Sequence, residues 1–253
     1  MNALAIGSVT LFCTFGSALA GMRLRSVLPP SQLDKESQDV VRVGMGLVAT
    51  MTALLLGLVT ASAKGTFDAQ DSAVRTSAAS LLSLDRLLAG YGPETAPARD
   101  SLKEVVRSRL ELTWPALGAP LRGATGLQPG QGGEAVQRAI LDLDPGTDTQ
   151  RWYKSQSLGL LQEVMKTRWL LLSSTAGAVP TVFLVVVIFW LGVTFMSFGL
   201  FSPKNMTVKV ALFIAAVSVA AAVFLILELN QPFDGLVKVS GQPLRYALEN
   251  LGR

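Results

Sequence analysis

The residue types that most enzymes and metal sites need are scarce in this sequence. It contains no histidine and a single cysteine, Cys13. A zinc site built on His or Cys, a His-ligated haem, an iron–sulfur cluster and a Ser-His-Asp triad are therefore excluded. The carboxylates of residues 64–168 alternate with basic residues and form no pair that indicates acid–base catalysis. We expect a protein that is not an enzyme, with no cofactor and no metal site.

A row of hydroxyl and aliphatic side chains is the first candidate for function. Thr52, Leu56 and Thr60 are four residues apart and would share one face of a helix. Two interpretations remain open for them. Threonines in membrane helices usually hydrogen-bond to backbone carbonyls of their own helix. Alternatively, the row lines a narrow pore that gates by dewetting.

A ridge of very small side chains is the second candidate, and it lies in the same stretch of sequence. Ala49, Ala53, Gly57 and Ala61 also recur every four residues. In lipid such a ridge lets helix backbones approach closely, so that van der Waals contacts hold the helices together. The sequence predicts helix packing here, either within one subunit or between subunits around an axis.

Charged residues beside apolar segments form the third candidate. Glu228 closes the last uncharged run, and Asp234 follows six residues later. Lys64, Asp68 and Asp71 leave the second uncharged run on the same side. Charge next to hydrocarbon is costly and often marks function. These groups would form either a structural ion pair at the membrane interface or an ion site at the mouth of a pore.

Four uncharged runs must position these candidates: residues 1–22, 43–63, 169–203 and 210–227. About 20 helical residues cross a hydrocarbon core of roughly 30 Å. Only 16% of the residues are charged, against about 25% in soluble domains, and the mean hydropathy is +0.43. The sequence predicts an all-α membrane protein with four transmembrane helices in two hairpins and a helical extramembrane region between them.

The expected organisation has four parts. Residues 1–63 form the first transmembrane hairpin, 64–168 a helical region, 169–230 the second hairpin, and 231–253 a C-terminal amphipathic segment. Pro180 interrupts the third uncharged run, because proline starts or kinks a helix. The third membrane helix is therefore expected at 178–200, after an interfacial turn or bent extension over residues 169–177.

Residues 64–168 are expected to be mainly helical. No proline occurs from residue 43 to residue 92, so the second membrane helix can leave the membrane unbroken and end near Gly90. Further helices are predicted at 96–114, 134–142 and 150–168, with a Gly- and Pro-containing loop over 118–133.

Three stretches resemble a bacterial family labelled a bestrophin-like domain of unknown function. They are residues 40–64, the sequence Phe67-Asp68-Ala69-Gln70, and residues 226–235, which end in Gln231-Pro232-Phe233-Asp234-Gly235. The resemblance covers nearly the whole chain. The family has no established biochemistry, so its motifs indicate relationship rather than activity.

The wider resemblance is to bestrophins, which are pentameric anion channels whose second membrane helix lines the pore. It implies a homo-oligomer, pentameric by analogy, in the bacterial inner membrane, with residues 64–168 and both termini in the cytoplasm. Two departures limit the comparison. The segment around Asp234 lacks the acidic cluster that helps animal bestrophins bind calcium, and residues 43–63 lack the aromatic pore neck.

The leading hypothesis is a channel-like homo-oligomer that conducts small ions. Thr52, Leu56 and Thr60 would form the pore wall, and Glu228 with Asp234 the cytosolic mouth. The alternative is a non-conducting membrane scaffold or regulatory protein whose residues 64–168 dock a protein partner. Lys and Arg nowhere form a run of five, so no nucleic-acid partner is expected. The direction in which the small-residue ridge and the threonine face point would discriminate between the two hypotheses.

Overall fold

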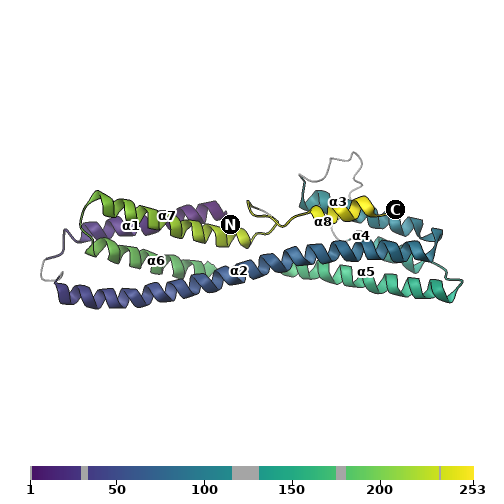
Figure 1. Ribbon diagram of the computed structural model, residues 1–253, viewed down its shortest axis with the longest axis horizontal. Coiled ribbons are helices and arrows are strands. Elements are labelled where there is room, and N and C mark those ends of the chain that lie inside the picture. Colours follow the sequence, from purple (N-terminus) through teal and green to yellow (C-terminus); the bar gives the residue numbers. More distant parts are fainter. Residues whose placement is uncertain (1, 30–33, 116–130, 175–180, 234) are drawn as a thin grey trace. The chain divides into compact units, whose positions relative to one another are not determined.

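The computed structural model describes residues 2–29, 34–115, 131–174, 181–233 and 235–253, and the regular structure in these ranges is helical (Figure 1). The chain forms two compact units. The first, here called the apolar unit, comprises Met1–Phe67 and Gly177–Val237. The second, the polar unit, comprises Asp68–Ala176 and Lys238–Arg253.

The apolar unit contains α1 (Ala3–Leu24), the first part of α2 (Lys35–Tyr91), α6 (Thr181–Phe201) and α7 (Met206–Leu229). All four helices are long and apolar enough to cross a membrane. The prediction of an all-helical chain with four candidate membrane helices is therefore confirmed. Pro180 and the residues around it, 175–180, lie outside the described residues, so the expected helix start at residue 178 stays a prediction, and α6 is described from Thr181.

α1 packs closely on α6 and α7, and its crossing with α6 brings the two backbones together. A Cβ atom added to Gly21 would collide with the backbone of Met196, and one added to Gly199 would collide with the carbonyl of Ala18. Ala18 itself is completely buried. Glycine and alanine at such a crossing allow backbones to approach in the way that favours helix association in lipid.

α2 is one continuous helix of 57 residues. The prediction that it leaves the second uncharged run without a break is confirmed, and its end at Tyr91 matches the expected stop near Gly90. Within the polar unit its buried positions recur in steps of three and four: Val74, Ser77, Leu81, Leu84, Leu88 and Tyr91. This spacing places one apolar stripe of the helix against its neighbours.

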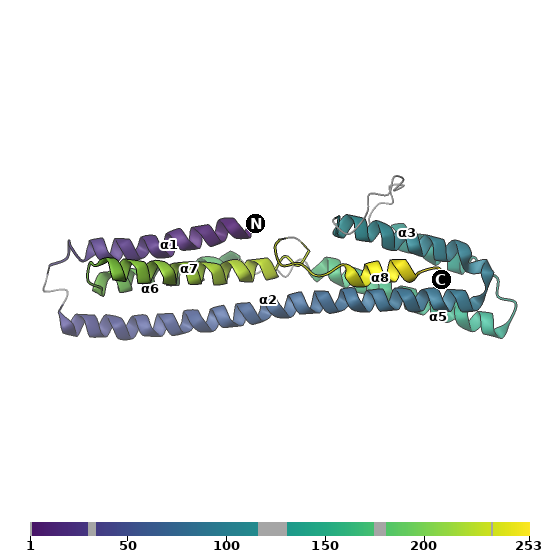
Figure 2. The same cartoon turned by 45° about the horizontal axis from the view of Figure 1, so that its top comes forward.

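The polar unit is completed by α3 (Ala96–Thr113), α4 (Gln131–Leu141), α5 (Asp148–Ser174) and α8 (Gln242–Asn250) (Figure 2). Three helices were predicted here, at 96–114, 134–142 and 150–168, and each is present. α5 continues six residues beyond its expected end, so residues 169–174 are helical. The predicted loop over 118–133 extends too far, because residues 131–133 belong to α4; residues 116–130 are outside the described ranges.

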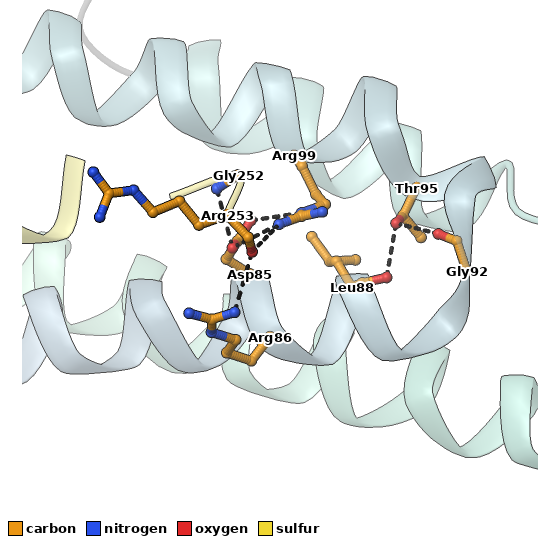
Figure 3. A network of polar contacts seen from close by, with 8 residues as sticks. All are labelled: Asp85, Arg86, Leu88, Gly92, Thr95, Arg99, Gly252 and Arg253. Carbon is orange, nitrogen blue, oxygen red and sulfur yellow. Dashed lines mark hydrogen bonds and ion pairs between the residues drawn. The ribbon is translucent and has the colours of Figure 1, made fainter. Parts of the chain in front are cut away.

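A buried ion pair joins α2 to α3 where the chain turns back (Figure 3). The Arg99 guanidinium donates to both carboxylate oxygens of Asp85, at 2.7 and 2.9 Å. The hydrogen bond to Asp85 raises the pKa of Arg99. The backbone N–H of Gly252 donates to the same carboxylate at 3.2 Å. The segment that follows α8 is thereby fixed to the α2–α3 turn.

A second polar contact fixes the segment that precedes α8. The indole N–H of Trp114, at the end of α3, donates to the carbonyl of Val239 at 2.8 Å, and both residues are buried. A buried indole requires such an acceptor. Together with the Asp85 carboxylate, this hydrogen bond holds both ends of α8 against the polar unit.

The glycine crossing predicts a large difference between two glycines of α1. Gly21→Ala should destabilise the apolar unit by about 1–3 kcal/mol, because the new methyl group meets rigid backbone. Gly16→Ala is the matched control, since a Cβ at Gly16 meets nothing within 4 Å and alanine favours a helix. Thermal unfolding of the detergent-solubilised protein measures both, and equal midpoints would contradict the crossing.

Loss of the buried ion pair should also be costly. Arg99→Leu leaves the Asp85 carboxylate, whose side chain is 1% exposed, without its charged partner. It should lower the free energy of unfolding by about 3 kcal/mol. Arg151→Leu is the control, because the Arg151–Asp148 pair is largely exposed and such pairs contribute little. Chemical denaturation of each variant gives the comparison. A cost for Arg99→Leu no greater than that of the control would show that the pair does not hold the turn.

Candidate functional site

The face of α2 that carries Thr52 and Leu56 packs against the apolar unit's own helices. Thr52 is 3% exposed, and its hydroxyl donates to the carbonyl of Val48 at 2.7 Å. Leu56 is half-buried and packs on a cluster formed by Ala3, Leu184, Val223 and Leu227. Thr60 is exposed, and its hydroxyl donates to the carbonyl of Leu56 at 2.6 Å. The structure therefore does not give the three residues a common surface.

The small-residue ridge of α2 is exposed over its second half, whereas Ala49 at its start lines a cavity with Ser197 and Phe198 of α6. Ala53, Gly57 and Ala61 are exposed, and Ala49 is half-buried. A Cβ atom added to Gly57 would meet nothing within 4 Å. Only 6% of the apolar window of α2 is buried, compared with 44% in α6. Much of the apolar surface of α2 is thus available to lipid or to another copy of the chain.

The exposed surface of α2 is divided into two stripes of opposite character. Successive residues turn by about 100° around a helix, so residues spaced by four, three, four and four lie on one side. The first stripe, called the small-residue stripe below, is Gly46, Thr50, Ala53, Gly57 and Ala61. The second, called the aliphatic stripe, is Leu47, Met51, Leu54 and Leu58, which are 50–70% exposed.

The two stripes suit different surroundings. Large aliphatic side chains suit contact with lipid tails. The small-residue stripe adds the Thr50 hydroxyl, which donates to the Gly46 carbonyl at 2.9 Å, and Thr60 lies beside it. Short side chains leave the helix backbone accessible, so this stripe suits close approach of another helix or contact with water.

Glu228 fixes the turn that follows α7. Its side chain is buried, with 5% exposed, and its carboxylate accepts a hydrogen bond from the backbone N–H of Leu236. Gly235 has φ of +112°, and a Cβ there would collide with the same carboxylate. The positive φ and the close carboxylate together require glycine at this position. Asp234, the other predicted mouth residue, lies outside the described residues.

One polar contact inside the polar unit was not predicted from the sequence. Arg109 is half-buried on α3, and its guanidinium donates to the Ser77 hydroxyl at 3.4 Å. Burial, with repulsion from Arg168 as a smaller cause, lowers the pKa of Arg109. The sequence did contain a signal for this partly buried arginine, because Arg109 lies next to buried positions of α3 such as Val106 and Leu110.

The geometry of Glu228 predicts a local effect on backbone protection. Glu228→Ala removes the acceptor of the Leu236 N–H, and hydrogen exchange at that amide should become at least about tenfold faster. Glu228→Gln keeps a side-chain oxygen and should retain most of the protection. Hydrogen–deuterium exchange resolved at the 229–237 segment measures this. Equal protection in all three proteins would mean that the carboxylate does not hold the turn.

Comparison with known proteins gives one match. A family model described as "Bestrophin-like domain" matches residues 12–244, which include the second half of α1, all of α2, α6 and α7, and most of the polar unit. No curated protein and no solved structure matches the chain.

Proposed function

Because the chain belongs to the bestrophin-like family, we propose that it assembles into a homo-oligomeric, channel-like membrane protein in which α2 of each copy faces a central axis. The family and the four apolar helices indicate a multi-pass membrane protein. The proposal further places it in the bacterial inner membrane, as a pentamer by analogy, with small ions as the conducted species. A channel of this kind is not an enzyme and needs no cofactor.

The exposed small-residue stripe is the observation that carries the proposal. A helix that only touched lipid would gain nothing from presenting Gly46, Thr50, Ala53, Gly57 and Ala61 on one side. Around an axis the same residues allow several copies of α2 to approach without filling the space between them. The hydroxyl of Thr50 would supply a polar group to ions in transit.

The proposed lining differs in part from the row expected from the sequence. Thr60 stays beside the small-residue stripe and keeps its place in the wall. Thr52 and Leu56 are assigned a supporting role, because they pack within their own subunit. Glu228 remains proposed for the cytosolic mouth together with Asp234.

A non-conducting scaffold is the second candidate, and one observation favours it. The Thr52 and Leu56 face packs on helices of the same subunit, as expected if α2 serves mainly for assembly. In that case the small-residue stripe joins copies of α2 in direct contact, and residues 64–168 dock a protein partner.

Cysteine accessibility separates the two candidates. In a background with Cys13→Ser, Gly57→Cys and Ala53→Cys should react with a charged, membrane-impermeant thiol reagent in proteoliposomes, and the reaction should abolish most of the current in planar bilayers. Leu58→Cys and Leu54→Cys are the controls on the aliphatic stripe and should react at least about tenfold more slowly, since thiolates form poorly in lipid.

Two results would contradict the channel proposal. A purified wild-type oligomer, with Gly57 and Thr60 unchanged, that conducts no ion in planar bilayers would favour the scaffold. Faster modification of Leu58→Cys than of Gly57→Cys would place the aliphatic stripe, rather than the small-residue stripe, in contact with water.

A further inference from the structure

We infer that the apolar unit binds the phosphate headgroup of an anionic phospholipid through Arg23, Lys204 and Lys209. These three cations line a cavity of about 520 Å³ formed by α1 and the residues at the start of α7. The other side of the cavity is apolar and includes Gly16, Leu19 and Ala20. The inference does not depend on whether the protein conducts ions.

The shape of the cavity follows from the sequence of α1. Gly16, Ala20 and Arg23 are spaced by four and three residues, so they lie on one face of the helix. The short side chains of Gly16 and Ala20, one helical turn apart, leave a depression on that face, and Arg23 lies at its end. A hydrocarbon chain fits against such a hollow while its headgroup meets the guanidinium.

The two lysines are held in place by the turn between α6 and α7. The Arg25 guanidinium donates to the carbonyl of Ser202, which fixes the start of this turn at the end of α1. The Asn205 side chain caps α7 by accepting from the N–H of Val208 at 2.9 Å. Lys204 and Lys209 therefore flank the first turn of α7, where the helix dipole adds positive potential.

The charge of the cavity is uncompensated by the groups around it. Among the residues that the structure describes, Arg42 lies 3.9 Å from Asp39, and no described ion pair involves Arg23, Lys204 or Lys209. Asp34 is engaged with the backbone N–H of Ser37 at 3.1 Å. Three exposed cations around one hollow attract an anion that can accept several hydrogen bonds, such as a phosphate.

The position of the cavity along the helices favours a lipid over a free ion. Arg23 directly follows the uncharged run 1–22, and Lys209 directly precedes the uncharged run 210–227. These are the points at which helices leave hydrocarbon, so the cations would lie at headgroup level. A free phosphate would use the cations and leave the apolar wall of Gly16, Leu19 and Ala20 without a partner.

Native mass spectrometry of the detergent-solubilised protein, titrated with phosphatidylglycerol, tests the site. Each cation near a membrane surface strengthens binding of anionic lipid about fivefold. The triple variant Arg23→Gln, Lys204→Gln, Lys209→Gln should therefore weaken the tightest binding about a hundredfold. Lys35→Gln is the matched control, because it removes an exposed cation of the same unit that does not line the cavity and should change affinity less than about threefold.

A second variant keeps the test decisive if the triple variant fails to fold. Ala20→Phe retains all three cations and fills the apolar hollow, and it should weaken phosphatidylglycerol binding at least about tenfold. Folding of both variants is checked by circular dichroism and by elution as a single species.

Four results would overturn the inference. The first two are unchanged phosphatidylglycerol binding in the triple variant and unchanged binding in Ala20→Phe. The third is binding of zwitterionic phosphatidylcholine as tight as that of phosphatidylglycerol. The fourth is displacement of bound phosphatidylglycerol by millimolar inorganic phosphate as effectively as by added phosphatidylglycerol. The last result would identify a site for a free anion instead.

Discussion

The close crossing of α1 and α6 is the contact on which the rest of the apolar unit depends. In lipid, helices gain little from hydrophobic burial, so small residues that bring backbones together must supply the association. Gly21 and Gly199 do so here. α1, α6 and α7 bury 28–44% of their apolar windows, whereas α2 buries 6%. Of the four apolar helices, α2 therefore leaves the largest share of its apolar window uncovered.

The helices themselves could be predicted from the sequence, because they depend on local properties. An uncharged run of membrane length, or a long stretch without proline, identifies a helix without knowledge of its neighbours. This reasoning located all four apolar helices and the unbroken α2. It placed residues 131–133 in a loop because the stretch contains Gly and Pro. A Cβ atom added to Gly132 would collide with the Val105 side chain, so this glycine lies at a close approach of α4 to α3 that the sequence alone does not reveal.

The orientation of each helix face could not be predicted in the same way. Thr50, Thr52 and Thr60 are chemically identical, yet only Thr52 is buried, and the difference comes from clusters on α1, α6 and α7 that lie far away in sequence. The ridge of α2 was visible as a repeat of four, but its exposure was not. The α1–α6 crossing escaped notice because its glycines lie on two different helices and form no repeat within either one.

We propose that the small-residue stripe of α2 surrounds an axis between copies of the chain. Cryo-electron microscopy of the protein in lipid nanodiscs shows whether it does. We expect a closed ring of copies in which Thr50, Ala53 and Gly57 face a continuous axial space, while Leu54 and Leu58 face lipid or a neighbouring copy. A monomer, or a ring in which Leu54 and Leu58 face the axis, would contradict it.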